Sequence, residues 1–395
     1  MGTVLVAGFG FWLFRQGVPP KVAAWLPKTV AGRFSLMSRK SEPVGGKDSP
    51  YFWGQQAAAV DAATPLPGGP LLDEAARRLV ALPHCECKIR QRVELMGQQL
   101  AGAGNYAQLS TTEVDRTRVR WELKFQVGDR LASVQQVNDG RFFWSRFDLP
   151  GRQSLGRVDL RTLREVQQRE SSIPPEAALR SWLALGGLSR LLQGLSDHFE
   201  LGWAQPRVVE TTPVWVLVGT WKPAALARLV PASQPLIEQH RPVPIDRLPS
   251  HLPDLVVVVL SRDPRLPLFP YRVEYRRSRD GMIRGTEPLV AATSDNDLSD
   301  NRKSDNDSRD NGKPTRAGER SGGAGKAVPG FSDDPLQSQR LENTAELAVL
   351  DLFEVNIETP PDPQGFVFQP PADQQALDET DRFLAPWLAA LPPAS

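Results

Sequence analysis

Apolar and charged residues alternate at a period of two along several stretches of this chain. In residues 85–95, apolar side chains such as Cys85, Ile89 and Val93 alternate with charged ones. In residues 117–127, every second residue is apolar: Val119, Trp121, Leu123, Phe125 and Val127. Neighbouring side chains on a strand point to opposite faces, so both stretches predict strands with one apolar and one charged face.

Further strands and turns extend this pattern. The sequence Asn138-Asp139-Gly140 is a strong hairpin signal between two apolar stretches. Residues 213–221, 254–261 and 268–277 also read as strands, and in the first of them Trp215, Leu217 and Trp221 share one face. Strands that follow one another without intervening helices predict an antiparallel sheet.

The C-terminal part predicts a closing strand over residues 346–358. Its period-two register places one set of apolar residues on a single side: Leu347, Val349, Phe353, Val355 and Ile357. Phe366 and Phe368 follow, two positions apart, and are expected to share one face before Pro370 and Pro371 end the sheet.

Helices are few and short. Residues 71–82 carry apolar residues at helical spacing. Residues 156–168 read as a basic strand or loop. A helix is expected to start after Ser171-Ser172-Ile173-Pro174 and to run to about His198, with a break at Gly186-Gly187.

These elements predict an α+β fold, in which a large curved antiparallel sheet forms an incomplete, half-open β-barrel covered by short helices. Such a sheet must cover its apolar face, and the helices at 71–82 and 175–198 can do so. Bulky apolar residues then become candidates for an enclosed ligand-binding surface: Val119, Trp121, Leu123, Phe125, Trp144, Trp182, Trp215 and Leu217. The alternative is that these side chains simply fill a core.

Composition and charge change this picture little. The 395 residues carry a formal charge of +1 with no strongly single-signed stretch, so a nucleic-acid partner is not expected. The two cysteines, Cys85 and Cys87, are two positions apart on one strand, where a disulfide has poor geometry. Two buried thiols are expected, and they do not decide the cellular compartment.

The domain organisation follows from changes in composition. Residues 1–14 are an apolar segment that reads as an export signal or a retained membrane anchor, and the alternative is a buried strand or helix of the domain. Residues 15–68 read as a linker rich in Pro, Gly and Ala, and residues 69–395 as the folded domain. The near-repeat of Asp, Asn and Ser within 294–327 predicts a disordered insert.

The sequence contains few residues in arrangements that are typical of a catalytic or metal site. His84-Cys85-Glu86-Cys87 contains metal-type ligands, but a strand turns His84 and Glu86 away from the thiols, and no second pair completes a site. The four histidines are scattered along the chain. No catalytic residue, metal or cofactor is therefore expected, and the protein is predicted not to be an enzyme.

The order of elements resembles the superfamily of the LolA-type outer-membrane lipoprotein carrier and its mycobacterial lipid-binding (LppX- and LprG-like) relatives. A short helix precedes the strands, and residues 137–144, Val-Asn-Asp-Gly-Arg-Phe-Phe-Trp, are similar to a hairpin of that family. The ending from Phe353 to Pro371 looks like the family's last strand and its F-x-F-x-x-P motif. The match covers roughly residues 70–390.

The resemblance implies a non-enzymatic exported protein that binds a lipid or lipoprotein acyl chain between the sheet and its helical lid. It implies a monomer in the periplasm or cell envelope, tethered to the inner membrane if residues 2–14 are retained. One alternative is an interaction or sensor module of the same fold that binds an envelope membrane protein, and another is a hydrolase that uses the cleft.

Overall fold

The computed structural model describes residues 64–95, 98–110, 117–127, 130–169, 174–209, 211–283, 341 and 343–388. The segment 1–14, the linker up to residue 63 and the insert 294–327 lie outside these residues. Apart from 341 and 343, the described residues belong to one compact unit that joins the chain up to Glu287 with the chain from Thr344 onward.

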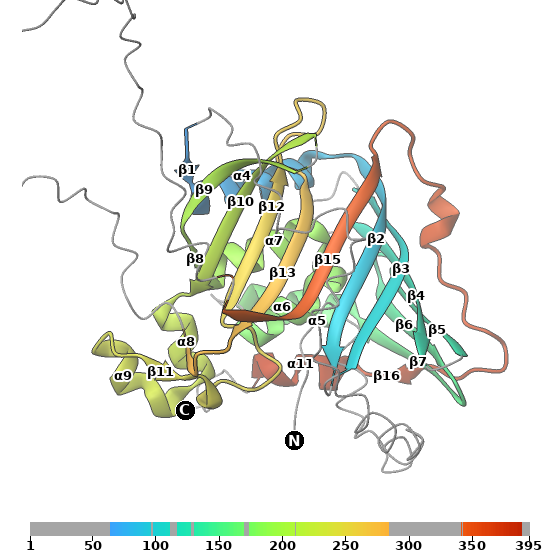
Figure 1. The fold of residues 1–395 in the computed structure, drawn as a ribbon. Helices are drawn as coiled ribbons and strands as arrows, with labels where there is room; N and C mark the ends of the chain where they lie inside the picture. The colour runs from blue at the N-terminus through green and yellow to red at the C-terminus, as the bar shows by residue number, and fades with distance from the viewer. Residues whose placement is uncertain are drawn as a thin grey trace, which may run out of the picture. The chain divides into compact units, whose positions relative to one another are not determined.

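One large curved sheet dominates this unit (Figure 1). Its strands, in chain order, are β1 (Leu66–Pro67), β2 (His84–Leu95), β3 (Gln98–Leu109), β4 (Arg118–Val127), β5 (Arg130–Asn138), β6 (Phe142–Leu149), β7 (Arg152–Asp159), β8 (Phe199–Leu201), β9 (Trp203–Val209), β10 (Thr212–Trp221), β12 (Leu255–Ser261), β13 (Pro270–Ser278), β15 (Thr344–Asn356) and β16 (Leu377–Asp378). A separate pair consists of β11 (Val243–Pro244) and β14 (Met282–Ile283).

The spatial order of the sheet is β1-β9-β10-β12-β13-β15-β2-β3-β4-β5-β6-β7-β16, with β8 also paired to β10. Among the described strands every pairing is antiparallel except that of β16 with β7. Neither of the terminal strands, β1 and β16, pairs with the other, so the sheet stays open. The predicted α+β class with an open, curved antiparallel sheet is confirmed.

Short helices cover one face of the sheet, and those of residues 68–81 and 160–198 lie behind it in Figure 1. The helices are α4 (Gly68–Ala81), α5 (Leu160–Arg169), α6 (Pro175–Leu185), α7 (Leu188–His198), α8 (Pro223–Leu229), α9 (Gln234–Glu238) and α11 (Thr380–Leu388), with 3₁₀ turns η1 (Pro231–Ser233), η2 (Ile245–Arg247) and η3 (Pro363–Phe366). The predicted break at Gly186-Gly187 separates α6 from α7.

We call the face that meets the helices the inner face, and the opposite one the outer face. The inner face carries the apolar side of the alternating strands, as in Cys87 and Ile89 of β2, Trp121 of β4 and Leu350 of β15. These side chains form one continuous core with the buried sides of α4, α6 and α7. The alternation along each strand therefore determines which side chains face the helices.

The closing strand differs from its prediction. Glu354 has a φ of 50°, and the pairing with β2 shifts register between Phe353 and Asn356, which marks a bulge. Before the bulge the inner-face residues are Ala348, Leu350 and Leu352, and after it they are Val355 and Ile357. The five predicted residues therefore do not share a side: Leu347, Val349 and Phe353 alternate with the inner set.

The prediction of a strand over residues 365–369 is wrong. These residues form the end of η3 and an extended segment. Phe366 is fully buried, and Phe368 packs on the outer face beside Trp144. The guanidinium of Arg120 donates to the carbonyl of Gly365 at 3.1 Å, which fixes this segment to β4. In Figure 1 it forms part of the red stretch that leads from β15 to β16.

Two further boundaries differ from the predictions. Residues 156–168 are neither wholly strand nor loop, because β7 ends at Asp159 and α5 follows. Leu160 and Leu163 are buried and Val166 is partly buried; this spacing of three places them on one side of a helix. The end of the predicted linker is also part of the fold, since Leu66–Pro67 pairs with β9 and Gly68 begins α4.

Candidate functional site

Four of the predicted site residues lie on β4. Val119, Trp121, Leu123 and Phe125 point to the inner face and are each at most 4% exposed. Lys124, between two of them, is exposed on the other side. The sequence pattern thus found a buried apolar strip, and helix α6 packs against this strand.

Trp182 of α6 completes an aromatic group with this strip. Its ring centroid lies 5.6 Å from that of Trp121, with an interplanar angle of 89°. Tyr106 of β3 approaches Trp121 at 6.2 Å and 74°. Edge-to-face contacts of this kind stabilise by about 0.5–1.5 kcal/mol beyond the burial of area. The indole N–H groups of Trp121 and Trp182 are buried without a hydrogen-bond partner.

Trp215 and Leu217 lie on the same inner face but on a distant strand. They belong to β10, which is separated from β4 by β12, β13, β15, β2 and β3. The guanidinium carbon of Arg262 lies 4.7 Å from the centroid of the Trp215 ring. Apart from Trp144, the predicted residues therefore form two groups at the inner face, joined by the core between them.

Trp144 lies on the outer face, which corrects its prediction as a site residue. Its indole N–H donates to Asp139 Oδ2 at 2.9 Å, and its ring stacks on Phe368 with centroids 5.1 Å apart. Phe142, Phe143 and Trp144 follow one another on β6, and only the middle ring reaches the inner core. Alternation along the strand excludes Trp144 from the interior.

Polar groups of the inner face hold the α6–α7 turn, which we call the elbow (residues 184–188). The amide of Asn138 donates to the carbonyl of Ala184 at 2.7 Å, at the end of α6. The hydroxyl of Tyr106 accepts from the N–H of Leu188 at 3.1 Å and donates to Gln108 Oε1 at 2.7 Å. Burial raises the pKa of Tyr106 well above its ordinary value, so the phenol is a neutral donor.

Gln91 is an inner-face residue that the sequence pattern did not predict as part of the site. Gln91 of β2 occupies the apolar register between Ile89 and Val93 and is 1% exposed. Both its Oε1 and its Nε2 are buried without a hydrogen-bond partner. The signal was present in the sequence, because Gln91 is the polar residue that interrupts the apolar series Cys85, Cys87, Ile89, Val93.

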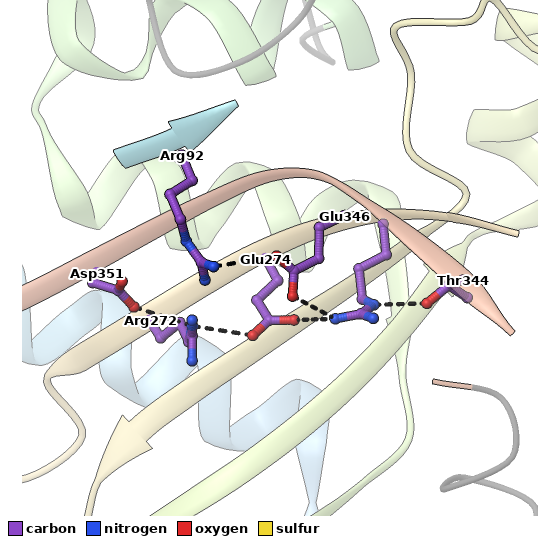
Figure 2. A network of polar contacts seen from close by, with 7 residues as sticks. Arg92, Arg272, Glu274, Thr344, Glu346 and Asp351 are labelled. Carbon is purple, nitrogen blue, oxygen red and sulfur yellow. Dashed lines mark hydrogen bonds and ion pairs between the residues drawn. The ribbon is translucent and has the colours of Figure 1, made fainter. Parts of the chain in front are cut away.

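The outer face carries a charged network that joins β2, β13 and β15 (Figure 2). Charges of opposite sign follow one another in the order Arg92, Glu346, Arg276, Glu274, Arg272 and Asp351. Arg272 Nε lies 3.0 Å from Glu274 and 3.1 Å from Asp351, and all three residues are at most 4% exposed. Burial raises the pKa of Asp351, and Arg272 opposes that shift. A balanced network of this kind ties strands together and offers no reactive group.

Two histidines are neutral at physiological pH. Burial, with positive charges nearby, lowers the pKa of His198 and of His251 to about 4. They lie on different elements, at the end of α7 and in the stretch before β12. Among the described residues, no three side chains of His, Cys, Asp or Glu gather in a way that could hold a metal ion. Nor does any helix in this part of the chain combine the length and apolarity needed to cross a bilayer.

No family model matches the sequence, and a search of curated proteins found no match. Solved structures gave several matches. LprF from Mycobacterium bovis is 8% identical and aligns with 55% of this chain and 90% of its own, at a TM-score of 0.28. A LolA superfamily protein from Nitrosomonas europaea is 10% identical and covers 77% of this chain and 98% of its own, at a TM-score of 0.22.

A putative outer-membrane lipoprotein-sorting protein domain from Vibrio parahaemolyticus is 11% identical and covers 54% of this chain and 74% of its own, at a TM-score of 0.25. Similarity at this level carries no function across, so the function has to come from the chain's own residues.

Proposed function

We propose that this protein binds a lipid or lipoprotein acyl chain between the inner face of its sheet and helices α6 and α7, without catalysing a reaction. The observation that supports this most is the apolar strip of β4, which faces α6 and meets it through Trp121 and Trp182. Each methylene buried there would contribute about 0.8 kcal/mol, so one acyl chain can bind usefully without any catalytic group.

Binding on this strip requires a change in packing. The side chains of β4 and α6 contact one another, and Trp121 and Trp182 are at most 1% exposed. The polar bonds from the sheet to the α6–α7 pair lie at the elbow, whereas Trp182 meets the strip through ring contact. An acyl chain therefore enters by separating α6 from β4 while the elbow stays fixed.

The location follows from the same proposal. Residues 2–14 are uncharged and apolar and are followed by Arg15, as expected of an export signal or anchor. We place the protein in the periplasm or cell envelope, as a monomer, possessing no cofactor. Cell fractionation with an antibody against the folded part checks this, and recovery in the cytosol alone would contradict it.

A fluorescent fatty-acyl probe tests the proposal on the full chain. Saturable uptake of about one probe per chain is expected, as for a single apolar site. Phe125→Arg places an unpaired charge in the strip and should abolish uptake, because such a charge is costly to bury. Lys124→Arg, on the exposed side of the same strand, is the matched control and should bind normally.

Circular dichroism of each variant separates lost binding from lost folding. If the folded wild-type chain takes up no probe, the proposal is wrong. The module that binds an envelope membrane protein would then be the better account of this fold.

A further inference from the structure

The amide of Gln91 differs from the other buried amides of the inner face, each of which has a partner at one end or at both. Gln136 donates to Ser145 Oγ at 3.5 Å and lacks a partner only at its Oε1. Gln108 accepts from Tyr106 and donates to the carbonyl of Leu79 at 3.5 Å. Asn138 donates to Ala184 and accepts from the N–H of Gly140 at 2.8 Å. Gln91 is as buried as these two residues and has a partner at neither end of its amide. Buried polar groups are rarely left unsatisfied, so this one calls for an explanation.

Gln91 lies beside the apolar strip of β4. It is paired with Leu350 of β15 on one side and with Gly102 of β3 on the other. Gly102 has no side chain, and a Cβ built there would lie 3.0 Å from Leu123 Cγ and 3.1 Å from Phe125 Cβ. Leu123 and Phe125 thus lie against Gly102, and no side chain of this residue stands between the strip and Gln91.

We propose that Gln91 is the polar anchor of the bound acyl lipid and hydrogen-bonds the carbonyl of its ester or amide linkage. The inference rests on the proposed function and names the ligand class. Nε2 can donate to such a carbonyl, and Oε1 can accept from an amide N–H or a hydroxyl next to it. The ligand gains a hydrogen bond, and the protein loses an unsatisfied group.

The surroundings select a neutral group over a carboxylate. Ile89, Val93 and Leu350 are the inner-face neighbours of Gln91 and carry no charge. Arg90 and Arg92, adjacent in sequence, point to the other face, where Arg92 pairs with Glu346. A free fatty-acid carboxylate would be buried there without a counter-charge, whereas an ester or amide would not.

Two probes of equal chain length test the inference on the full chain: the methyl ester of a pyrene-labelled fatty acid and a pyrene-labelled alkane. The wild type should bind the ester roughly fivefold to tenfold more tightly, the value of one buried hydrogen bond. Gln91→Leu should bind the alkane at least as well as the wild type and should show no preference for the ester.

Thermal unfolding of the ligand-free protein gives an independent readout. Gln91→Leu should raise the melting temperature, because it removes an unsatisfied amide from an apolar core. Gln108→Leu is the matched control and should lower it, because the hydroxyl of Tyr106 loses its acceptor and the carbonyl of Leu79 loses its donor.

The outcomes separate the two proposals. If the wild type binds both probes equally, or if Gln91→Leu keeps the ester preference, Gln91 is not the anchor and the acyl-binding function stands. A melting temperature lowered by Gln91→Leu as much as by Gln108→Leu would also overturn the inference. If the wild type binds neither probe, the proposed function itself fails, and the inference fails with it.

Discussion

Trp121 is the residue of the inner face that contacts both Tyr106 and Trp182. It is 0% exposed and has Tyr106 on one side and Trp182 on the other, both in edge-to-face contact. It therefore joins three elements, β3, β4 and α6, through one ring system. A residue in this position contributes both to stability and to the surface that we propose for an acyl chain.

Replacing Trp121 with Ala should lower the free energy of unfolding by about 3–5 kcal/mol, as large-to-small changes in a core do. Lys124→Ala, on the exposed side of the same strand, should change it by less than about 0.5 kcal/mol. Urea unfolding of both variants checks this. Equal losses would mean that the two faces of β4 are assigned wrongly.

His198 predicts how stability depends on pH. Its pKa falls to about 4 in the fold, from an ordinary value of 6.5, mainly through burial. The unfolded chain therefore takes up a proton at a higher pH than the folded one. Stability from this group is fully present above pH 6.5 and is lost as the pH falls towards 4, by up to about 3 kcal/mol.

Urea unfolding between pH 8 and 4 measures this loss. His198→Gln should reduce the slope over that interval, because it removes the proton-binding group. The pKa of His251 is also lowered in the fold, so part of the dependence of stability on pH should remain in this variant. An unchanged slope in the His198 variant would show that the histidine takes up its proton equally in the folded and unfolded chain, so that the fold does not lower its pKa.

For single residues, the sequence alone predicted which strand face is buried, but it did not predict the residues that depart from the alternation. Alternation placed Val119, Trp121, Leu123 and Phe125 together, because a single period governs all four. It could not place Trp144, since three aromatic residues in succession leave open which of them points inward. Gln91 could have been found as the break in an apolar series, but its missing hydrogen bonds depend on neighbours from other strands.

At the scale of elements, the elbow between α6 and α7 is the best-defined junction on the inner face. Gly187 has a φ of 73°, in a region that favours glycine, and a Cβ there would collide with the Tyr106 hydroxyl. The same hydroxyl accepts from the N–H of Leu188 at the start of α7. Backbone conformation and hydrogen bonding together set where the helix pair meets the sheet.

Gly187→Ala should lower the free energy of unfolding by at least 1–3 kcal/mol, roughly the cost of a strained backbone, with the collision added to it. Gly69→Ala is the control, since a Cβ there meets nothing within 4 Å. Alanine in that helix should stabilise by about 0.4–1 kcal/mol. Similar effects of the two substitutions in thermal unfolding would contradict this account of the elbow.

Local signals predicted this elbow but not every element. The pair Gly186-Gly187 marks a break in any helix, so the sequence located it. The bulge at Glu354 could not be foreseen, because a positive φ at a glutamate depends on its pairing with β2. The segment around Phe366 lies on the outer face because Arg120 and Trp144 hold it there, and both are distant in sequence.

In the molecule as a whole, the sheet separates an apolar surface from a charged one. Its inner face is apolar and covered by helices, whereas part of its outer face carries the charged network of Arg272, Glu274 and Asp351. The sequence predicted an open antiparallel sheet, and the structure confirms it. The order of the strands in the sheet could not be predicted from the sequence. Trp215 and Trp121 were therefore assigned to one predicted site, although five strands separate them.

Native mass spectrometry of the full chain, purified from its own membranes, shows whether the protein carries an acyl lipid. We expect a population whose mass exceeds that of the chain by one acyl lipid, and we expect release of that lipid on unfolding. Phe125→Arg should appear only at the mass of the protein, whereas Lys124→Arg should retain the lipid. If the folded wild-type chain carries no lipid and acquires none from added membranes, the protein does not bind acyl lipids.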